Sequence, residues 1–109
     1  MSNNDDNNNA LVIQENAAQH RFEATKNGQL AGFVEYNVLS DALMFTHTEV
    51  IEAFEGQGVG SALAKHVLGE ARRQGKQVIP VCQFIAGYIR KHPEYLDLVP
   101  EDSRRAFKV

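Results

Sequence analysis

The stretch FEGQGVGSALAKHVL, residues 54–68, places three glycines at alternate positions immediately before a run with helical spacing. Apolar residues recur at three- and four-residue intervals from Val59 to Ala71, which predicts an amphipathic helix that Gly75 ends. A glycine-rich turn at the start of a helix leaves several backbone amides unpaired, and the helix dipole adds positive potential there. The stretch therefore predicts a cradle for a phosphate group, with a plain tight turn as the alternative.

Two common phosphate-binding loops do not match these glycines. A nucleotide-binding P-loop has a lysine followed by serine or threonine after its last glycine, whereas Ser61 follows Gly60 directly here. A dinucleotide fingerprint needs a third glycine, but that position is Ser61 when counted from Gly56 and Leu63 when counted from Gly58. These two exclusions leave a helix start that holds another kind of phosphate through its backbone amides, or a plain tight turn.

The segments before this loop predict an antiparallel meander of three strands. Residues 21–25 and 29–38 alternate apolar and polar side chains, and the Asn27-Gly28 pair between them is a strong hairpin signal. A second turn near Ser40 leads into a third strand, residues 42–51. Regular alternation in this third strand would put the following side chains on one face: Leu43, Phe45, His47 and Glu49.

A short apolar strand, residues 78–82, follows the helix, so the connection predicts a parallel βαβ crossover. Pro80 removes one ladder donor, which requires an edge, a bulge or a locally splayed partner. Residues 84–90 predict a second helix, whereas residues 96–109 are compatible with a strand, a helix or a partly ordered tail. The predicted fold class is α/β, close to α+β: a mixed sheet with an antiparallel N-terminal meander, a βαβ crossover and a further helix.

Length and composition suit one domain of an ordinary soluble protein. Residues 2–9 are nearly all Asn and Asp, which predicts a disordered tail over residues 1–10 and one compact domain over residues 11–109. The formal net charge is -3 with no basic block, so nucleic acid is not an expected partner. No apolar run approaches the roughly 20 residues that cross a membrane, and no export signal is recognisable. We therefore expect a cytoplasmic protein with no membrane partner.

Cys82 is the single cysteine of the chain and is expected to be a free thiol. A thiol at the carboxyl end of a parallel strand lies where ligands usually bind in α/β sheets. It is a candidate nucleophile or proton donor, and a small buried core residue is the alternative. No cluster of His, Cys, Asp and Glu has metal-ligand spacing, so no metal is expected.

Four short motifs between residues 28 and 95 resemble the GNAT superfamily of N-acetyltransferases. The glycine loop resembles the superfamily's pyrophosphate-binding pattern R/Q-x-x-G-x-G/A. The sequences HTEV at residues 47–50, VCQF at residues 81–84 and HPEY at residues 92–95 resemble a branch of very short GNAT-like proteins. Members of this branch carry a cysteine after the last core strand and an H-P-E-Y ending.

The resemblance implies acetyl-CoA as the cofactor and a mixed sheet of the GNAT type. The pantetheine arm of acetyl-CoA would lie between the strand at residues 42–51 and the strand at residues 78–81. In the superfamily these two strands splay apart. The implied cofactor-binding residues are Val50, Gln57, Gly58, Val59, Gly60 and Ser61. The first position of the loop pattern is Glu55, where the superfamily has Arg or Gln. An acidic side chain beside a pyrophosphate is unfavourable unless it points outward.

Four residues are candidates for the chemistry that the resemblance implies. Cys82 could take the acetyl group as a thiolate or donate a proton to the CoA sulfur. His47 and Glu49 share a strand face, so either could act as general base; a half-solvated polar pair is the alternative. Tyr88 stands where these enzymes often place a tyrosine that protonates the thiolate, although its i,i+4 spacing from Phe84 also suits core packing.

The sequence thus predicts an acetyl-CoA-dependent N-acetyltransferase that acts on an amine of a small molecule or protein, as a monomer or weak homodimer. The alternative is a non-catalytic CoA- or acyl-CoA-binding module. This alternative arises because the chain is shorter than a typical GNAT domain and lacks much of the N-terminal helical part that shapes the acceptor site.

Overall fold

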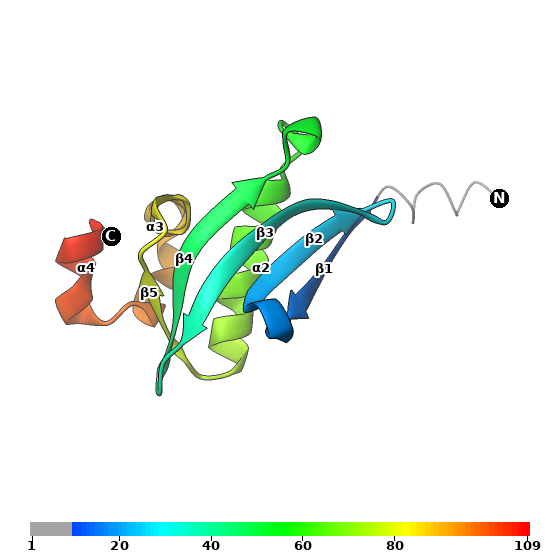
Figure 1. Cartoon of the computed structure of the whole chain (residues 1–109). Coiled ribbons are helices and arrows are strands. Elements are labelled where there is room, and N and C mark those ends of the chain that lie inside the picture. The colour runs from blue at the N-terminus through cyan, green and yellow to red at the C-terminus, as the bar shows by residue number, and fades with distance from the viewer. Residues whose placement is uncertain (1–9) are drawn as a thin grey trace.

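The computed structural model describes residues 10–109, which form a five-stranded sheet with its strands in sequence order (Figure 1). Strands β1 to β4 pair antiparallel, and β5 pairs parallel with β4. The strands are β1 Leu11–Asn16, β2 Arg21–Lys26, β3 Gln29–Val38, β4 Ala42–Val50 and β5 Gln77–Pro80. The helices are α2 Val59–Arg73, α3 Gln83–Lys91 and α4 Glu101–Phe107. The 3-10 segments are η1 Ala17–Gln19, η2 Glu52–Phe54 and η3 Pro93–Leu98.

Local signals in the sequence account for most of these elements, and the predicted mixed α/β fold is confirmed. The Asn27-Gly28 turn joins β2 to β3 with both residues at positive φ, as a tight hairpin turn requires. The sequence did not predict β1, because its second half, residues 14–16, is polar; pairing with β2 makes the meander four strands. The region left open at residues 96–109 contains α4. The tail predicted for residues 1–10 lies outside the described residues apart from Ala10.

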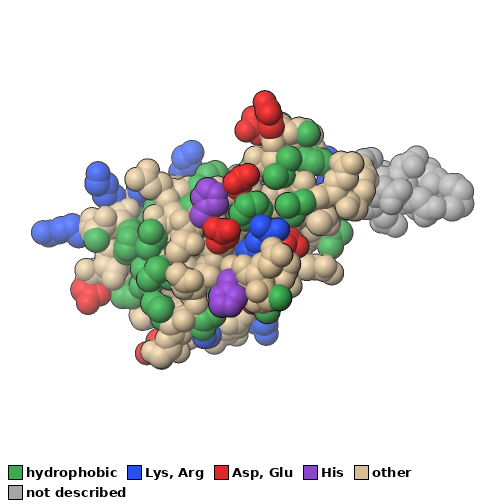
Figure 2. Space-filling view, viewed as in Figure 1, with side chains coloured by type: hydrophobic (Ala, Val, Ile, Leu, Met, Phe, Trp, Pro, Cys, Tyr) green, Lys and Arg blue, Asp and Glu red, His purple; other side chains and the backbone are tan. Residues whose placement is uncertain are grey.

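The helix α2 covers one face of the sheet and forms the core with it (Figure 1). Its apolar stripe is buried, and the residues of that stripe are Val59, Leu63, Ala64, Val67, Leu68 and Ala71. The chain is tightly packed at Gly32 of β3, where a Cβ atom would lie 2.7 Å from the Glu49 carbonyl oxygen of β4 and 3.0 Å from Val59 Cγ1 of α2. The opposite face of β2 to β4 carries charged side chains at the surface (Figure 2).

One prediction about β4 is wrong because the strand contains a bulge. Along β3 and β4 the pairing passes from Tyr36↔Phe45 directly to Glu35↔His47, so Thr46 is an extra residue in β4. An extra residue reverses which side chains face the core beyond it. Regular alternation had predicted that His47 shares a face with Phe45. Because of the bulge, His47 lies on the opposite face.

The register beyond the bulge shows which face each side chain takes. Thr48 lies opposite Val34, which is fully buried beneath α2, so Thr48 and Val50 point to the α2 side. His47 and Glu49 lie on the open face instead, and both side chains are half-exposed. The prediction that these two share a face is confirmed, but it is the face without the helix.

Two arginine side chains form hydrogen bonds between the C-terminal segments and the helices α2 and α3. Arg72 of α2 donates to both carboxylate oxygens of Asp97, each at 2.9 Å, and these hydrogen bonds lower the pKa of Asp97. Arg90 of α3 donates to the carbonyls of Phe107 and Lys108, which places α4 beside α3. Within residues 10–109, no helix is long and apolar enough to cross a membrane.

Candidate active site

The strands β4 and β5 separate from each other halfway along β4. Their pairing covers Ala42↔Gln77 through Phe45↔Pro80, after which the Cys82 amide donates to the Phe45 carbonyl at 2.8 Å. The chain then turns into α3, while β4 continues to Val50. Pro80, the last residue of β5, lies in an edge strand, which agrees with the requirement of its missing N–H. We call this divergence of residues 46–50 of β4 from the chain that enters α3 the gap.

Cys82 lies at the inner end of the gap, on the α2 side of the sheet. It is the N-cap residue of α3 and is 8% exposed, with its side chain in contact with the core. Its sulfur lies 3.2 Å from the hydroxyl oxygen of Thr48 on β4. The thiol thus lies just beyond the end of the parallel strand β5, close to where the sequence predicted it, and it is buried, which the sequence analysis gave as the alternative to a reactive thiol.

The glycine loop forms a hollow of about 320 Å³ at the start of α2, which we call the cradle. Its lining residues are Val50, Glu55, Gly56, Gly58, Val59, Gly60, Ser61 and Phe84. Gly56 and Gly58 have φ of 82° and 79°, which only glycine adopts at little cost. The first hydrogen bond of α2 in this loop runs from the Ala62 amide to the Gly58 carbonyl, so the amides of residues 59–61 precede it.

The predicted cofactor-binding residues gather in the cradle with the exception of Gln57. The side-chain oxygen of Gln57 accepts a hydrogen bond of 2.6 Å from Lys26 at the end of β2 instead. Glu55, which departs from the superfamily pattern, is among the lining residues, so the loop brings an acidic residue to the hollow. Val50 brings the last residue of β4 to the same place and connects the cradle with the gap.

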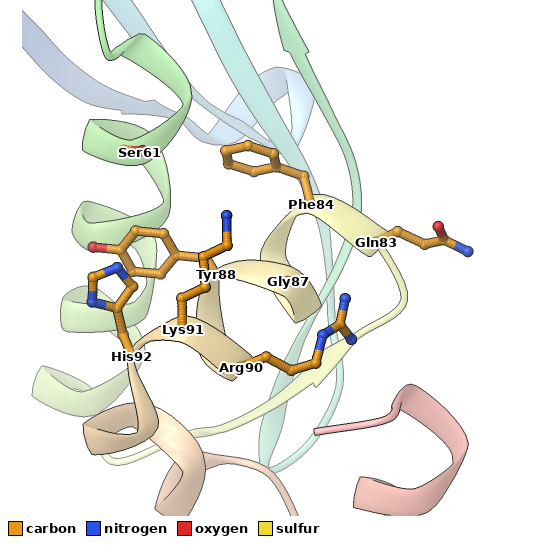
Figure 3. A pocket seen from close by; sticks show the side chains of 8 residues that line it. All are labelled: Ser61, Gln83, Phe84, Gly87, Tyr88, Arg90, Lys91 and His92. Atoms are coloured by element: carbon orange, nitrogen blue, oxygen red, sulfur yellow. The ribbon is translucent and has the colours of Figure 1, made fainter.

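A groove of about 360 Å³ between α2 and α3 continues from the cradle, and the two share Ser61 and Phe84 (Figure 3). The ring of Phe84 lies against Gly60, where a Cβ atom would come within 2.8 Å of it. The remaining lining residues are Gln83, Gly87, Tyr88, Arg90, Lys91 and His92. The cradle and the groove are thus neighbouring hollows that meet at Ser61 and Phe84.

Tyr88 lies in this groove, where its ring stacks on His92 with 4.0 Å between centroids (Figure 3). Burial, with Tyr95 and Glu94 nearby, raises the pKa of its phenol, which therefore stays protonated at neutral pH. Six residues of helix separate Tyr88 from Cys82, or about 9 Å along the axis of α3. Its role as proton donor to the thiolate stays a prediction.

His47 and Glu49 form a pair on the open face, with 3.2 Å between Nε2 and Oε1. Glu35 lies opposite His47 in the adjacent strand, and Phe33 lies opposite Glu49. The guanidinium of Arg21 covers the Phe33 ring at 4.3 Å from its centroid. This face therefore presents a base, two carboxylates and an aromatic ring beside the gap, and histidine and acidic side chains are visible there in Figure 2.

Sequence reasoning did not single out Thr48 and Phe84 as site residues, although both lie within the quoted motifs HTEV and VCQF. The side chain of Thr48 faces Cys82 only because the bulge at Thr46 reverses the alternation of β4. Phe84 was assigned to helix packing, yet it is 44% exposed and borders both hollows. Within residues 10–109, no three His, Cys, Asp or Glu side chains are grouped as a metal site would require.

Residues 21–98 match the sequence model of the GCN5-related N-acetyl-transferase family. The chain belongs to this family. The matched segment begins at β2 and ends in η3, so it contains the glycine loop, the gap, Cys82 and the groove. N-acetyl transfer is thus the activity of the class to which this chain belongs. A search of curated proteins found no relative of the chain.

Solved structures share the fold of this family member. A GCN5-like protein from Staphylococcus aureus, solved by NMR, is 24% identical with a TM-score of 0.62, over 85% of this chain and 89% of that one. The ribosomal-protein-S18-alanine N-acetyltransferase from Escherichia coli is 23% identical with a TM-score of 0.51, over 72% of this chain and 47% of that one. Ard1 from Thermoplasma volcanium is 28% identical with a TM-score of 0.50, over 56% and 43%. The chain therefore spans less than half of the latter two proteins.

Proposed function

We propose that the chain transfers an acetyl group from acetyl-CoA to an amine, with the cofactor on the α2 side of the sheet and the acceptor on the open face. The observation that carries this proposal is the gap, where β4 continues beyond its last β5 partner and the segment after β5 enters α3. Cys82 and Thr48 border it on the α2 side, while His47 and Glu49 stand on the opposite face of the same strand. A thioester in the gap is then within reach of an amine that approaches from the other face.

The residues around the cradle fit the pyrophosphate of CoA. The amides of residues 59–61 are donors without a helical partner, and the glycines at 56 and 58 leave room for the phosphates to approach the backbone. In the adjoining groove, Lys91 supplies a positive charge and the stacked rings of Tyr88 and His92 offer a flat surface that suits the adenosine portion. When bound, acetyl-CoA supplies the activated thioester. Glu55 is the one acidic residue among those lining either hollow.

The chemistry divides between the two faces of β4. An alkylamine is protonated at neutral pH, so it must lose a proton before it attacks a carbonyl carbon. His47 and Glu49 are placed to accept that proton on the open face, where the acceptor has access. On the other face two routes are open to Cys82. In the covalent route Cys82 loses its S–H proton and forms a C–S bond to the acetyl group as the CoA C–S bond breaks; the CoA sulfur takes up a proton, and the amine then takes the acetyl group from Cys82. In the direct route the amine takes the acetyl group from CoA, and Cys82 gives its S–H proton to the departing CoA sulfur. The cytoplasmic location and the oligomeric state expected from the sequence stay predictions.

Binding and turnover measurements separate the enzyme from a CoA-binding module. Calorimetry with CoA and acetyl-CoA should detect one site, and thiol release from acetyl-CoA should then depend on the amine offered from a panel of alkylamines and lysine-containing peptides. Tight acetyl-CoA binding with no amine-dependent thiol release would support the binding module instead. An absence of binding to either ligand would contradict both.

Glu55→Gln is expected to tighten acetyl-CoA binding by about 3- to 10-fold. Glu55 lines the cradle, and removing a like charge near a surface phosphate is worth about 1 kcal/mol. Calorimetry at two salt concentrations measures the change, which should shrink as salt rises. Glu52→Gln is the matched control, because Glu52 carries the same charge in η2 but does not line the cradle. Equal effects of the two substitutions would mean that overall charge, and not a local contact, controls the affinity.

His47→Gln and Glu49→Gln are each expected to lower kcat by about 10²- to 10⁴-fold if the residue is the base, because a positioned proton acceptor contributes that much. The Kd for acetyl-CoA should not change, since both side chains face away from the cradle. Stopped-assay kinetics and calorimetry on the same preparations measure the two quantities. Glu23→Gln, on the same face but on β2, serves as the control. If neither substitution reduces kcat, the open face is not where the amine is deprotonated.

A further inference from the structure

The hydroxyl of Thr48 and the sulfur of Cys82 lie 3.2 Å apart across the gap. The two residues are 34 positions apart in the chain, and they come from β4 beyond its last β5 partner and from the cap of α3. The Cys82 amide is already held by the Phe45 carbonyl at 2.8 Å. The hydrogen bond between the two side chains therefore fixes the position of the Cys82 sulfur, whose backbone is already anchored, and this selects one χ1 rotamer.

The local geometry of β4 directs Thr48 toward this sulfur. The neighbouring Thr46 hydroxyl donates to the Glu35 carbonyl of the adjacent strand, which is an ordinary partner for a threonine in a sheet. Thr48 reaches across to a side chain on another element instead. It faces that way because of the bulge at Thr46, which costs β4 one regular position in its ladder.

In both routes open to Cys82, its sulfur carries a negative charge at one stage. In the covalent route a thiolate attacks the acetyl carbon, and in the direct route the thiol gives its proton to the CoA sulfur and becomes a thiolate. Cys82 is 8% exposed, so water offers this charge little help. A buried ion is costly unless a donor is aimed at it.

We propose that Thr48 is a positioning residue that orients the Cys82 sulfur and donates its O–H to it when the sulfur is a thiolate. This inference rests on the proposed function, in which Cys82 takes part in acetyl transfer. It holds for either route, because the same sulfur carries the charge in both. Removing the hydroxyl should leave the binding of acetyl-CoA at the cradle unaffected, since Thr48 is not among the residues that line it.

Alkylation of Cys82 by iodoacetamide tests the proposal without any transferase assay. Cys82 is the only cysteine, so the rate of mass gain reports on this sulfur alone. A hydrogen bond to a charged group is worth about 1.5–3 kcal/mol, so its loss reduces the thiolate population by about 10- to 100-fold. The remaining thiolate is more nucleophilic, which offsets about half of that effect on a logarithmic scale. Thr48→Val should therefore alkylate about 3- to 10-fold more slowly than the wild type.

Three further variants keep the result interpretable. Thr48→Ser retains the hydroxyl and should restore the rate to within about twofold. Thr46→Val removes the neighbouring hydroxyl and should leave the rate unchanged, because Thr46 bonds the Glu35 carbonyl. Thr48→Ala replaces Thr48→Val if the valine variant does not fold, with circular dichroism and thermal midpoints checked for all. The proposal would be overturned if folded Thr48→Val were alkylated at the wild-type rate. It would also be overturned if Thr48→Ser were alkylated as slowly as Thr48→Val.

Failure of this inference and failure of the proposed function give different results. If Cys82→Ala keeps full transferase activity while Thr48→Val still slows alkylation, Thr48 positions a sulfur that acetyl transfer does not use. If Cys82→Ala loses activity while Thr48→Val alkylates normally and turns over normally, the function stands and the positioning role is wrong. If the proposed function and the positioning role of Thr48 are both correct, kcat should fall in Thr48→Val and recover in Thr48→Ser. The Kd for acetyl-CoA should not change in either variant.

Discussion

Cys82→Ala is expected to lower kcat for acetyl transfer by about 10²- to 10⁴-fold while the Kd for acetyl-CoA stays the same. A positioned proton-transfer group or nucleophile contributes a factor of this size, and Cys82 is not among the residues that line the cradle. The substitution removes one sulfur atom at the edge of the core, so the fold should persist. Stopped-assay kinetics and calorimetry on the same preparation measure the two quantities.

Intact-protein mass spectrometry decides between the two roles of this thiol. Wild-type protein mixed with acetyl-CoA in the absence of amine should gain the mass of one acetyl group if Cys82 is the nucleophile, and Cys82→Ala should not. No mass gain, together with the loss of kcat in Cys82→Ala, assigns the sulfur to proton donation. Unchanged turnover in Cys82→Ala would remove the residue from the mechanism altogether.

Gly32→Ala is expected to destabilise the protein by about 1–3 kcal/mol or more, which is the usual cost of overpacking. A Cβ at this position would lie 2.7 Å from the Glu49 carbonyl oxygen, 3.0 Å from Val59 Cγ1 and 3.3 Å from Leu63 Cδ1. The nearest of these is backbone, so β4 or α2 must move. For a chain of this size the thermal midpoint should fall by roughly 4–8 °C for each kcal/mol.

Gly69→Ala in α2 is the matched control for that experiment. Nothing lies within 4 Å of its Cβ position, and the residue is in the interior of the helix. Alanine there should raise the free energy of unfolding by about 0.5–1 kcal/mol, because glycine is a poor helix former. The thermal midpoint and the free energy of unfolding should therefore fall in Gly32→Ala and rise in Gly69→Ala. A shift of the same sign and size in both would contradict the close approach of α2 to β3.

The sequence carried more information about the cradle than about the arrangement of the candidate catalytic residues. Gly58 and Gly60 are identified by their spacing before a helix, and this signal is local, so the loop lies where it was predicted. Gln57 shows the limit of the same reasoning, because its side chain turns to Lys26, which is 31 residues away in the chain. Lys26 gave no signal in the sequence, since nothing in its neighbourhood connects the β2–β3 hairpin with the loop.

The sequence by itself determined the helix α2, the β2–β3 hairpin, the glycine loop and the cysteine at the end of the last strand, because each depends on periodicity or on residues adjacent in the chain. Only the tertiary structure decided which face of β4 carries His47 and which carries Thr48. A bulge is one extra residue in a ladder, and alternation within one strand cannot reveal it. At Thr46 it turns Thr48 toward Cys82 and His47 toward the open face, and the buried contacts of β4 with α2 and α3 hold it there.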